Sequence, residues 1–351
     1  MIKPRKNIME MDEYRPPLEG RRGFLRLDFN ENTVGPSPKV TDVLKKISEA
    51  DLAAYPEYSK FQSKLAAHFD IDENELLITN ATDEAIMVIM QTYLSEGDEI
   101  LIPTPTFAMF RFYAQISGAE IREVLYNKDL TFPTRQVLDK ISSKTRIVVL
   151  CNPNNPTATL IDKEDIIEII EKAGSNDALV LLDEAYYEFS RQTMLDKINR
   201  YSNLIILRTF SKAMGLGGLR LGCAIANKKV IAELSKVRSP YSINMAAVKA
   251  GEAAIDDQDY VKWYINEIEK GKKLIYGELD RLKIKIYPSS ANFFLAQFKD
   301  PLKVCRKLKE KGILVRDRST YPLLQNCIRI SIGTEKQMRQ LANALKEPDL
   351  Q

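Results

Sequence analysis

The sequence predicts an α/β protein with a mostly parallel sheet covered by helices, followed by a smaller α+β lobe. Short runs of β-branched residues and leucine alternate with amphipathic stretches as far as Asn244, which is typical of parallel sheets between helical layers. Beyond Asn244 the pattern changes to long helices and a few short strands. The length of 351 residues also favours two lobes, because one compact core rarely serves so long a chain.

The elements of the first lobe follow from hydrophobic pattern. Short apolar runs predict strands at Leu76–Thr79, Glu99–Pro103, Arg146–Cys151, Ala178–Asp183, Asn203–Thr209 and Leu219–Ala226. Apolar residues at helical spacing predict helices at Lys39–Ala50, Ser59–Phe69, Asp83–Leu94, Lys163–Ala173 and Lys228–Val237. Ligands of such sheets bind at the carboxyl ends of the strands, where this sequence also places its polar residues.

The rest of the chain divides into a tail and a second lobe. Helices are expected there at Ala246–Ala254, Asp259–Leu282, Pro301–Lys311 and Thr334–Leu345. The Pro-rich, irregular segment 1–40 is expected to pack on this second lobe. The predicted division is therefore an N-terminal segment, 1–40, a large domain, 41–243, and a small domain, 244–351.

Composition excludes several classes of protein. The net charge is only +3, with 51 basic and 48 acidic residues spread along the chain, so nucleic-acid binding is not expected. No apolar run approaches the length of a membrane span, and the basic segment Met1–Glu10 lacks the apolar stretch of a signal peptide. We expect a soluble, cytoplasmic protein without membrane contact.

The cysteines and the single histidine limit the kinds of catalytic and metal site that the chain can form. The four cysteines are far apart and mostly in apolar runs, which predicts reduced core thiols. His68 is the only histidine and falls near a helix end, where a surface or capping role is usual. A serine–histidine triad with any other base and a multi-histidine metal site are therefore excluded, and no metal is expected. Lysine is the obvious candidate for proton transfer.

Lys212 is the candidate catalytic lysine. It follows the apolar run Asn203–Thr209 and has Ser211 beside it, glycines after it and Arg220 eight positions on. A desolvated lysine near a cation has a lowered pKa, as a nucleophilic amine requires, and arginine can hold a phosphate with two hydrogen bonds. This layout predicts a lysine that condenses with the aldehyde of pyridoxal phosphate, against the alternative of a solvated lysine.

Two further strand ends carry polar residues. Asp183 ends an apolar run and can pair with a pyridinium nitrogen, or it can cap a helix instead. Tyr186 can hydrogen-bond the oxygen on the cofactor ring. Asn155, in Asn152–Thr157, can donate a hydrogen bond to the same oxygen, although the segment also has the composition of a plain turn.

A phosphate site is predicted where the strand Leu76–Thr79 meets its helix. Thr82 and Asp83 lie at the helix start, where free backbone amides bind anions, and either side chain can also cap the helix. Phe107 follows the next strand and can stack on a flat ring or belong to the core.

Together these motifs resemble the fold-type I pyridoxal-phosphate-dependent aminotransferases, in particular the histidinol-phosphate aminotransferase group. The resemblance runs from about Tyr14 to Thr334 and is more specific for the cofactor than for the substrate. It rests on Asp183-Glu184-Ala185-Tyr186, on Ser211-Lys212 with Arg220, on Asn155-Pro156-Thr157, and on Leu27–Asn32 with Gly35-Pro36.

The resemblance implies a seven-stranded, mostly parallel sheet in a large domain that binds pyridoxal 5′-phosphate, and a smaller α+β domain. It implies catalytic roles for Lys212, Asp183 and Tyr186. The implied cofactor contacts are Thr82, Asp83, Phe107, Asn155, Asp183, Tyr186, Thr209, Ser211, Lys212 and Arg220. Tyr55 is implied to reach the cofactor phosphate of a neighbouring subunit, so a homodimer is expected.

The resemblance also implies a substrate site. Arg329 matches the arginine that grips an α-carboxylate, Arg316 and Tyr14 match positions that meet a substrate phosphate, and Asn30 lies in the segment that faces the substrate. A surface ion pair with Asp317 or another neighbour is the alternative for Arg316. The expected reaction moves an amino group between an amino acid or amino alcohol phosphate and a 2-oxo acid, with L-histidinol phosphate and 2-oxoglutarate as the leading pair.

The chain departs from the family pattern at three positions. Ala81 and Ala158 replace usual glycines, and Phe107 replaces a usual tyrosine. Related enzymes act on aromatic amino acids or decarboxylate threonine phosphate on nearly the same framework, so both activities stay open as alternatives. A non-catalytic pyridoxal-phosphate-binding regulator is a remoter one, since no basic helix-turn-helix extension precedes the fold.

Overall fold

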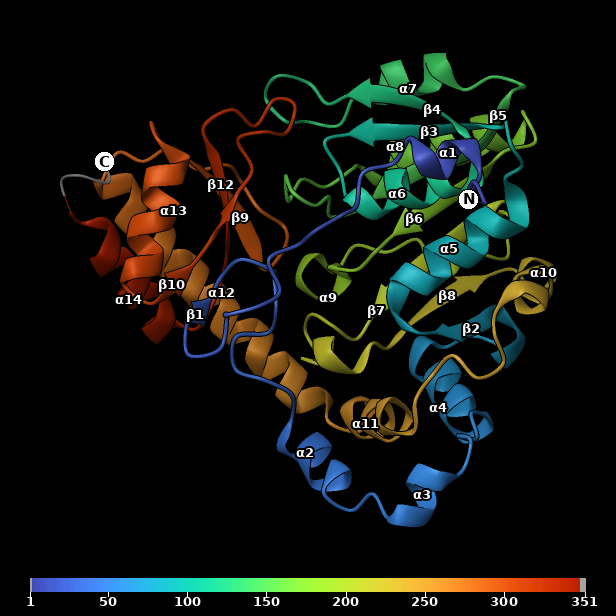
Figure 1. Ribbon diagram of the computed structural model, residues 1–351, viewed down its shortest axis with the longest axis horizontal. Coiled ribbons are helices and arrows are strands. Elements are labelled where there is room, and N and C mark those ends of the chain that lie inside the picture. Colours follow the sequence, from blue (N-terminus) through green and yellow to red (C-terminus); the bar gives the residue numbers. More distant parts are fainter. Residues whose placement is uncertain (1, 348–351) are drawn as a thin grey trace.

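A computed structural model describes residues 2–347 and contains a seven-stranded sheet with helices on both faces (Figure 1). The strand order is β2-β8-β7-β6-β5-β3-β4, and β8 alone in this sheet runs antiparallel to its neighbours. The strands are β2 (Leu76–Thr79), β3 (Glu99–Thr104), β4 (Glu120–Leu125), β5 (Thr145–Cys151), β6 (Leu179–Asp183), β7 (Leu204–Thr209) and β8 (Gly222–Ala226). The predicted fold class is confirmed.

Alternating side chains of the strands feed two apolar cores. In β5, Val148 and Leu150 face one core, while Ile147 and Val149 face the other. The first core is closed by α4 (Ser59–Phe69), α7 (Thr134–Lys140), α8 (Lys163–Gly174) and α11 (Met245–Ile255). The second is closed by α5 (Ala81–Tyr93), α6 (Ala108–Ser117) and α10 (Lys228–Val237). Because β5, β6 and β7 run parallel to one another, their carboxyl ends meet at one edge.

Several elements of the first lobe differ from the sequence prediction, among them the helices α6 and α7, which were not predicted. The expected helix Lys39–Ala50 is divided into α2 (Pro38–Leu44) and α3 (Glu49–Ala53), because Ser48 starts a new helix with a capping box in which Asp51 bonds back to it. The strand β4 was not predicted. It pairs only with β3 at the sheet edge, and its mostly exposed, charged residues lack the apolar alternation of a strand.

The second lobe is built from long helices on a small antiparallel sheet. The helices are α12 (Gln258–Arg281), α13 (Pro301–Glu310) and α14 (Glu335–Leu345), and the sheet consists of β9 (Phe293–Gln297), β11 (Arg316–Asp317) and β12 (Cys327–Ser331). Its core includes Tyr264, Phe294 and Leu341. Arg316 lies directly opposite Arg329 in the register of β11 and β12, so both side chains project from the same face.

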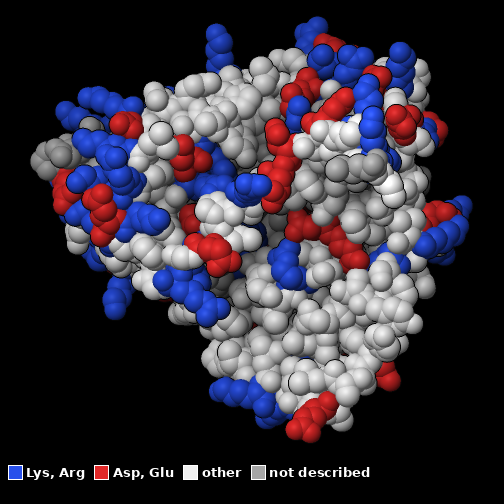
Figure 2. Space-filling view, viewed as in Figure 1, with Lys and Arg blue, Asp and Glu red and all other residues white. Residues whose placement is uncertain are grey.

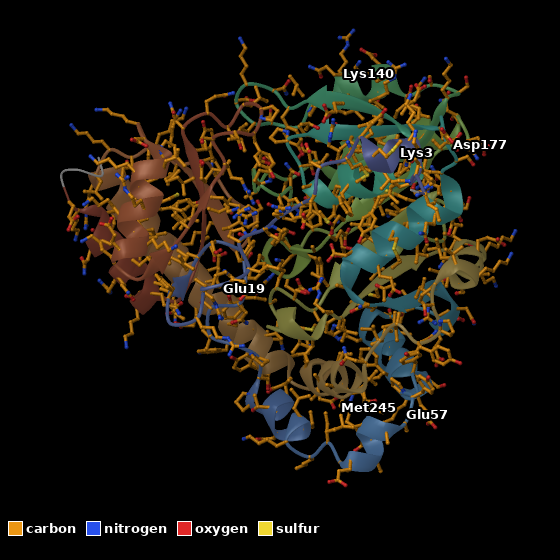
Figure 3. The ribbon with its side chains drawn as sticks, viewed as in Figure 1. Lys3, Glu19, Glu57, Lys140, Asp177 and Met245 are labelled. Carbon is orange, nitrogen blue, oxygen red and sulfur yellow. The ribbon has the colours of Figure 1, made fainter. Side chains whose placement is uncertain are left out.

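The N-terminal segment runs between the two lobes. Its helix α1 (Lys6–Met9) lies against α6, and Asn7 donates a hydrogen bond of 2.8 Å to the carbonyl of Gln115. Further on, β1 (Leu25–Arg26) pairs in parallel with β10 (Ile313–Leu314) of the second lobe. In Figure 3, Glu19 marks the stretch between these contacts, and Met245 marks the start of α11. The division at residues 40 and 243 stays a prediction.

The remaining elements are short connections: α9 (Tyr187–Ser190), η1 (Glu73–Glu75), η2 (Leu195–Lys197) and η3 (Gly217–Leu219). Within residues 2–347 no helix combines the length and apolar character needed to span a bilayer.

Candidate active site

A cavity of about 200 Å³ opens at the carboxyl edge of the large sheet, where the second lobe faces it. Figure 2 shows the molecule hollowed near its centre, with basic and acidic side chains along the hollow. Most of the predicted site residues line this cavity: Tyr14, Asn30, Thr82, Asp83, Phe107, Asn155, Asp183, Tyr186, Thr209, Ser211, Lys212, Arg220 and Arg329. Residues far apart in the sequence are therefore brought to one place by the sheet topology.

Lys212 lies in the loop after β7 and points into the cavity. Its Nζ donates a hydrogen bond of 3.3 Å to the carbonyl of Phe29 and lies 5.5 Å from the ring centre of Tyr186. Desolvation, followed by repulsion from Arg329, lowers the pKa of Lys212 to about 8. The amine is thus neutral in a substantial fraction of molecules near pH 8, and the alternative of a solvated lysine is wrong.

Close backbone packing holds the Lys212 loop in place. Gly215 has a φ of +74°, and a Cβ there would lie 2.9 Å from the carbonyl of Gly35 and the nitrogen of Pro36. Asn32 donates a hydrogen bond of 3.0 Å to the carbonyl of Ala213. The Gly35-Pro36 motif therefore supports the catalytic loop directly.

Asp183 ends β6 and lies in the cavity wall. Its Oδ1 accepts a hydrogen bond of 3.0 Å from the backbone nitrogen of Ala185, and no helix begins at it, since α9 starts after Tyr186. Burial raises the pKa of Asp183 to about 7, although the charge of Lys212 acts in the opposite direction. The capping alternative is wrong, and the buried carboxyl suits a cationic partner.

Hydrogen bonds link the second lobe to the sheet edge. Arg329 donates to Oδ1 of Asn155 at 2.6 Å and to the carbonyl of Asp28 at 2.6 Å. Asn30 donates to the hydroxyl of Tyr186 at 2.9 Å, which leaves the Tyr186 proton available for another acceptor. Burial, followed by repulsion from Arg318, lowers the pKa of Arg329 to about 9.

The start of α5 forms the anion-binding end of the cavity. No side chain caps this helix at Asn80, so the amides of its first turn, including those of Thr82 and Asp83, are free to bind an anion. Arg220 reaches the same point and forms a 2.6 Å ion pair with Asp83. A Cβ on Gly222 would lie 2.8 Å from the nitrogen of Thr82, so glycine is required for this close approach.

The substitutions Ala81 and Ala158 fall on strained backbone. Their φ angles are +62° and +61°, in the left-handed region that glycine adopts without cost. This explains why glycine is usual at both positions. Phe107 lines the cavity and also packs edge-to-face on Phe110, with 5.8 Å between the ring centres, so the cavity and core interpretations both apply.

The residues present fit pyridoxal phosphate. A partly neutral amine at Lys212 suits the aldehyde, the buried carboxyl of Asp183 suits a protonated ring nitrogen, and the uncapped start of α5 suits a phosphate. Ser211 and Thr209 lie between these points, and the backbone nitrogen of Ser211 donates a 3.1 Å hydrogen bond to the Thr209 hydroxyl.

Two predicted residues do not line the cavity. Tyr55 is 75% exposed and stacks on Tyr241 at a ring-centre distance of 4.6 Å. Arg316 is half-buried and lies 5.5 Å over the ring of Phe29. The ion pair given as its alternative does not form among residues 2–347, and Asp317 instead accepts a 2.8 Å hydrogen bond from the backbone nitrogen of Ser319.

The sequence argument missed two residues of the second lobe that line the cavity. Arg318 and Tyr321 both face it, and the guanidinium carbon of Arg318 lies 5.0 Å over the Tyr321 ring. In the sequence, the composition of Asp317-Arg318-Ser319 is typical of a solvated, charged loop. Only its position after β11, where the nitrogen of Arg318 donates to the carbonyl of Cys327 at 3.0 Å, brings it inward.

The fold and the cavity have the arrangement expected of an enzyme with a lysine at the carboxyl end of a mostly parallel sheet. The family of class I and II aminotransferases matches residues 22–345, and the chain belongs to this family. The predicted enzyme class, the fold-type I resemblance and the pyridoxal phosphate cofactor are thereby confirmed.

Within this family, the chain is similar to several histidinol-phosphate aminotransferases. A histidinol-phosphate aminotransferase of Caldanaerobacter subterraneus is 38% identical over 88% of this chain and 87% of its own length. One from Methanocaldococcus jannaschii is 33% identical over 92% of this chain and 89% of its own length. The crystal structure of the Clostridium acetobutylicum histidinol-phosphate aminotransferase has a TM-score of 0.84 at 25% identity and covers 92% of this chain and 98% of that one.

A further solved structure supports the fold alone. Histidinol-phosphate aminotransferase from Sinorhizobium meliloti, crystallised with pyridoxal-5′-phosphate, is 24% identical and has a TM-score of 0.88 over 97% of this chain and 96% of that one.

Proposed function

We propose that this aminotransferase moves the amino group of L-histidinol phosphate to 2-oxoglutarate, as a step of histidine biosynthesis. The names of relatives at 33–38% identity over most of the chain support this substrate pair. The observation that carries the proposal is one cavity containing the amine of Lys212, the carboxyl of Asp183 and the buried guanidinium of Arg329.

The chain's own residues divide the chemical work. When bound, pyridoxal phosphate supplies an aldehyde and an electron-withdrawing ring that weakens the bonds at the substrate α-carbon. Lys212 is the base that moves a proton at that carbon, because its pKa of about 8 lets it both accept and donate near neutral pH. Asp183 would keep the ring nitrogen protonated, and Tyr186 and Asn155 would hold the ring oxygen. The uncapped start of α5, Ser211, Thr209 and Arg220 would hold the cofactor phosphate.

Substrate binding falls to the second lobe and the N-terminal segment. Arg329 is placed to bind the α-carboxylate of 2-oxoglutarate, because its present partners, Asn155 and Asp28, offer only neutral oxygens. Tyr14, which is 43% exposed, and the buried Asn30 both line the cavity and are the proposed substrate contacts of the N-terminal segment. The role of Arg316 in binding a substrate phosphate stays a proposal.

A parallel assay with three donors tests the proposal. Purified holoenzyme is given L-histidinol phosphate, L-phenylalanine or L-threonine phosphate with 2-oxoglutarate, and both glutamate and carbon dioxide are measured. We expect glutamate from histidinol phosphate with the highest kcat/KM, and a loss of at least about 10⁴-fold in Lys212→Ala. A higher kcat/KM with phenylalanine, or release of carbon dioxide from threonine phosphate, would contradict the proposed substrate.

The same assay separates an enzyme from a regulator. A protein that binds the cofactor without turnover of any donor would be the non-catalytic alternative. A Lys212→Ala protein with normal turnover would contradict the role given to that lysine.

We also propose a cytoplasmic homodimer. Tyr55 and Tyr241 form an exposed aromatic pair, and the neighbouring Leu52 is 70% exposed, so this surface has the composition of an interface. Tyr55 points away from its own cavity, as a residue that serves a neighbouring subunit would. Light scattering on the holoenzyme is expected to give twice the chain mass of 40.0 kDa.

A further inference from the structure

The catalytic loop is attached to the N-terminal segment 29–36 at the lysine itself and at the residue after it. The amine of Lys212 donates its 3.3 Å hydrogen bond to the carbonyl of Phe29. Nδ2 of Asn32 donates a 3.0 Å hydrogen bond to the carbonyl of Ala213, and no other donor reaches this carbonyl among residues 2–347. The contact made by Asn32 therefore holds the loop backbone directly beside the lysine.

Asn32 uses both ends of its side-chain amide. Its Oδ1 accepts hydrogen bonds of 2.9 Å from the backbone nitrogens of both Val34 and Gly35, which forms a turn within the segment. Its Nδ2 then joins this turn to Ala213 of the catalytic loop. Asn32 is only 6% exposed and Ala213 is fully buried, so water does not replace the amide at the Ala213 carbonyl if the amide is removed.

The second lobe holds the same segment through a similar amide. Gln337 of α14 donates a 3.1 Å hydrogen bond to the carbonyl of Thr33. Like Asn32, Gln337 also accepts a hydrogen bond from a backbone nitrogen, that of Thr334 at 2.9 Å. The two side chains thus make equivalent bonds, but of the two only Asn32 reaches the loop of Lys212.

The reactivity of the Lys212 amine depends on its burial. Desolvation is the largest cause of its pKa of about 8, against an ordinary value of 10.5. Only the neutral amine attacks an aldehyde, so a lysine that moved toward water would be more fully protonated and slower to react. The charged groups that face the amine are Arg329 of β12, Glu31 of the segment, Arg220 after η3 and Asp183 at the end of β6. A neutral substitution of Asn32 leaves these groups in place and so acts on the amine through its burial.

Resting on the proposed role of Lys212 as the reactive amine, we propose that Asn32 is a positioning residue for this lysine. By holding the carbonyl of Ala213, it keeps the amine buried beside Phe29 and so keeps a reactive, neutral fraction of it near neutral pH. The segment 29–36 thus serves the chemistry as well as the packing of the two lobes.

Condensation of the cofactor-free protein with pyridoxal phosphate tests this without any substrate. In this reaction the amine adds to the aldehyde and water leaves, and visible absorption gives the rate between about pH 6 and 10. Asn32→Ser is the decisive variant, because a serine hydroxyl still accepts from the backbone of its own turn but has no second polar atom to bond to Ala213. We expect the midpoint of the pH–rate profile to rise by about one unit and the rate near pH 7 to fall about tenfold.

Two further variants separate positioning from stability. Asn32→Ala loses the turn as well, so it is expected to shift the midpoint like Asn32→Ser and to lower the Tm further. Gln337→Ala is the matched control, since it removes the equivalent amide from Thr33. It is expected to lower the Tm and to leave the midpoint at the wild-type value.

Two results would overturn the inference. A wild-type midpoint in Asn32→Ser would make Asn32 a residue of the turn only, and an equal shift of the midpoint in Gln337→Ala would mean that any loosening of the segment has the same effect. Because the condensation involves only protein and cofactor, failure of L-histidinol phosphate as a donor would contradict the proposed function and leave this inference standing.

Discussion

Asp183 and Glu184 are neighbours in the sequence and both are buried, but their hydrogen-bond and ion-pair partners differ. Glu184 forms a 2.6 Å ion pair with Arg208 and accepts hydrogen bonds from Thr193 and from the backbone of Met194. Asp183 accepts a 3.0 Å hydrogen bond from the backbone of Ala185, and burial raises its pKa to about 7. Of these two adjacent carboxylates, Glu184 has its negative charge neutralised by an arginine, whereas burial disfavours the negative charge of Asp183.

The difference separates a structural carboxylate from one reserved for a ligand. The charge of Glu184 is neutralised within the chain, so it fixes the turn that follows β6. Asp183 faces the cavity and its ionised form lacks such a partner, so binding a cation there recovers free energy that folding alone does not. The same contrast holds between Arg208, which is paired with Glu184, and Arg329, which bonds only to neutral oxygens among residues 2–347.

Of the changes at the two neighbouring carboxylates, Asp183→Asn is expected to have the largest effect. Asparagine keeps the shape but cannot hold the ring nitrogen protonated, so kcat/KM is expected to fall on the order of 10³-fold. The cofactor-free variant is expected to be more stable than the cofactor-free wild type at pH 8, by about 2–4 kcal/mol in urea unfolding. Loss of both activity and stability would place Asp183 with Glu184 as a structural residue.

The pH dependence gives the same test in the wild type. The carboxyl of Asp183 has a folded-state pKa raised from 3.8 to about 7, so between pH 4 and 7 the folded state binds a proton that the unfolded state has lost. This contribution to stability is therefore present below pH 4 and is lost as the pH rises to 7. The difference in urea stability between Asp183→Asn and the wild type is expected to grow over that window and then level off.

Glu184→Gln is the matched change at the neighbouring position. It leaves Arg208 buried without its partner and is expected to cost about 3 kcal/mol of unfolding free energy. The cost stays at the lower end of the usual range because Glu188, whose pKa burial raises to about 7, lies close enough to ionise beside Arg208. Urea unfolding measures the loss of unfolding free energy. At urea concentrations too low to unfold the variant, its kcat is expected to stay near the wild-type value. A stable but inactive protein would reverse the comparison.

Much of the large domain was predictable because local pattern and tertiary role agree there. The strand Leu76–Thr79 and the helices Ser59–Phe69 and Lys228–Val237 match the structure residue for residue. The edge strand β4 was not predictable from apolar alternation, since Val124 alone of its six residues is buried. The break between α2 and α3 was readable from Ser48 and Asp51, which form a capping box.

Site residues that follow the strands of the large sheet were predictable from the sequence, whereas some site residues of the second lobe were not. Asp183 and Lys212 follow long buried strands, so their place at the cavity follows from topology. Arg318 was missed because its inward direction depends on the pairing of β11 with β12, a register between segments that carry little apolar signal. Tyr55 lies on the surface of this chain, so its role toward a neighbouring subunit stays a prediction.

The smallest expected effect comes from backbone strain at the phosphate end. Ala81 has a φ of +62°, whereas Ala85, one turn later in α5, is an ordinary buried helical residue. The same change should have opposite signs at the two positions: Ala81→Gly is expected to stabilise the protein by about 1 kcal/mol, and Ala85→Gly to destabilise it by about 1 kcal/mol or more. Urea unfolding of both variants gives the two values. Equal destabilisation would mean that Ala81 is not strained, and that the uncapped start of α5 is held by contacts stronger than its backbone preference.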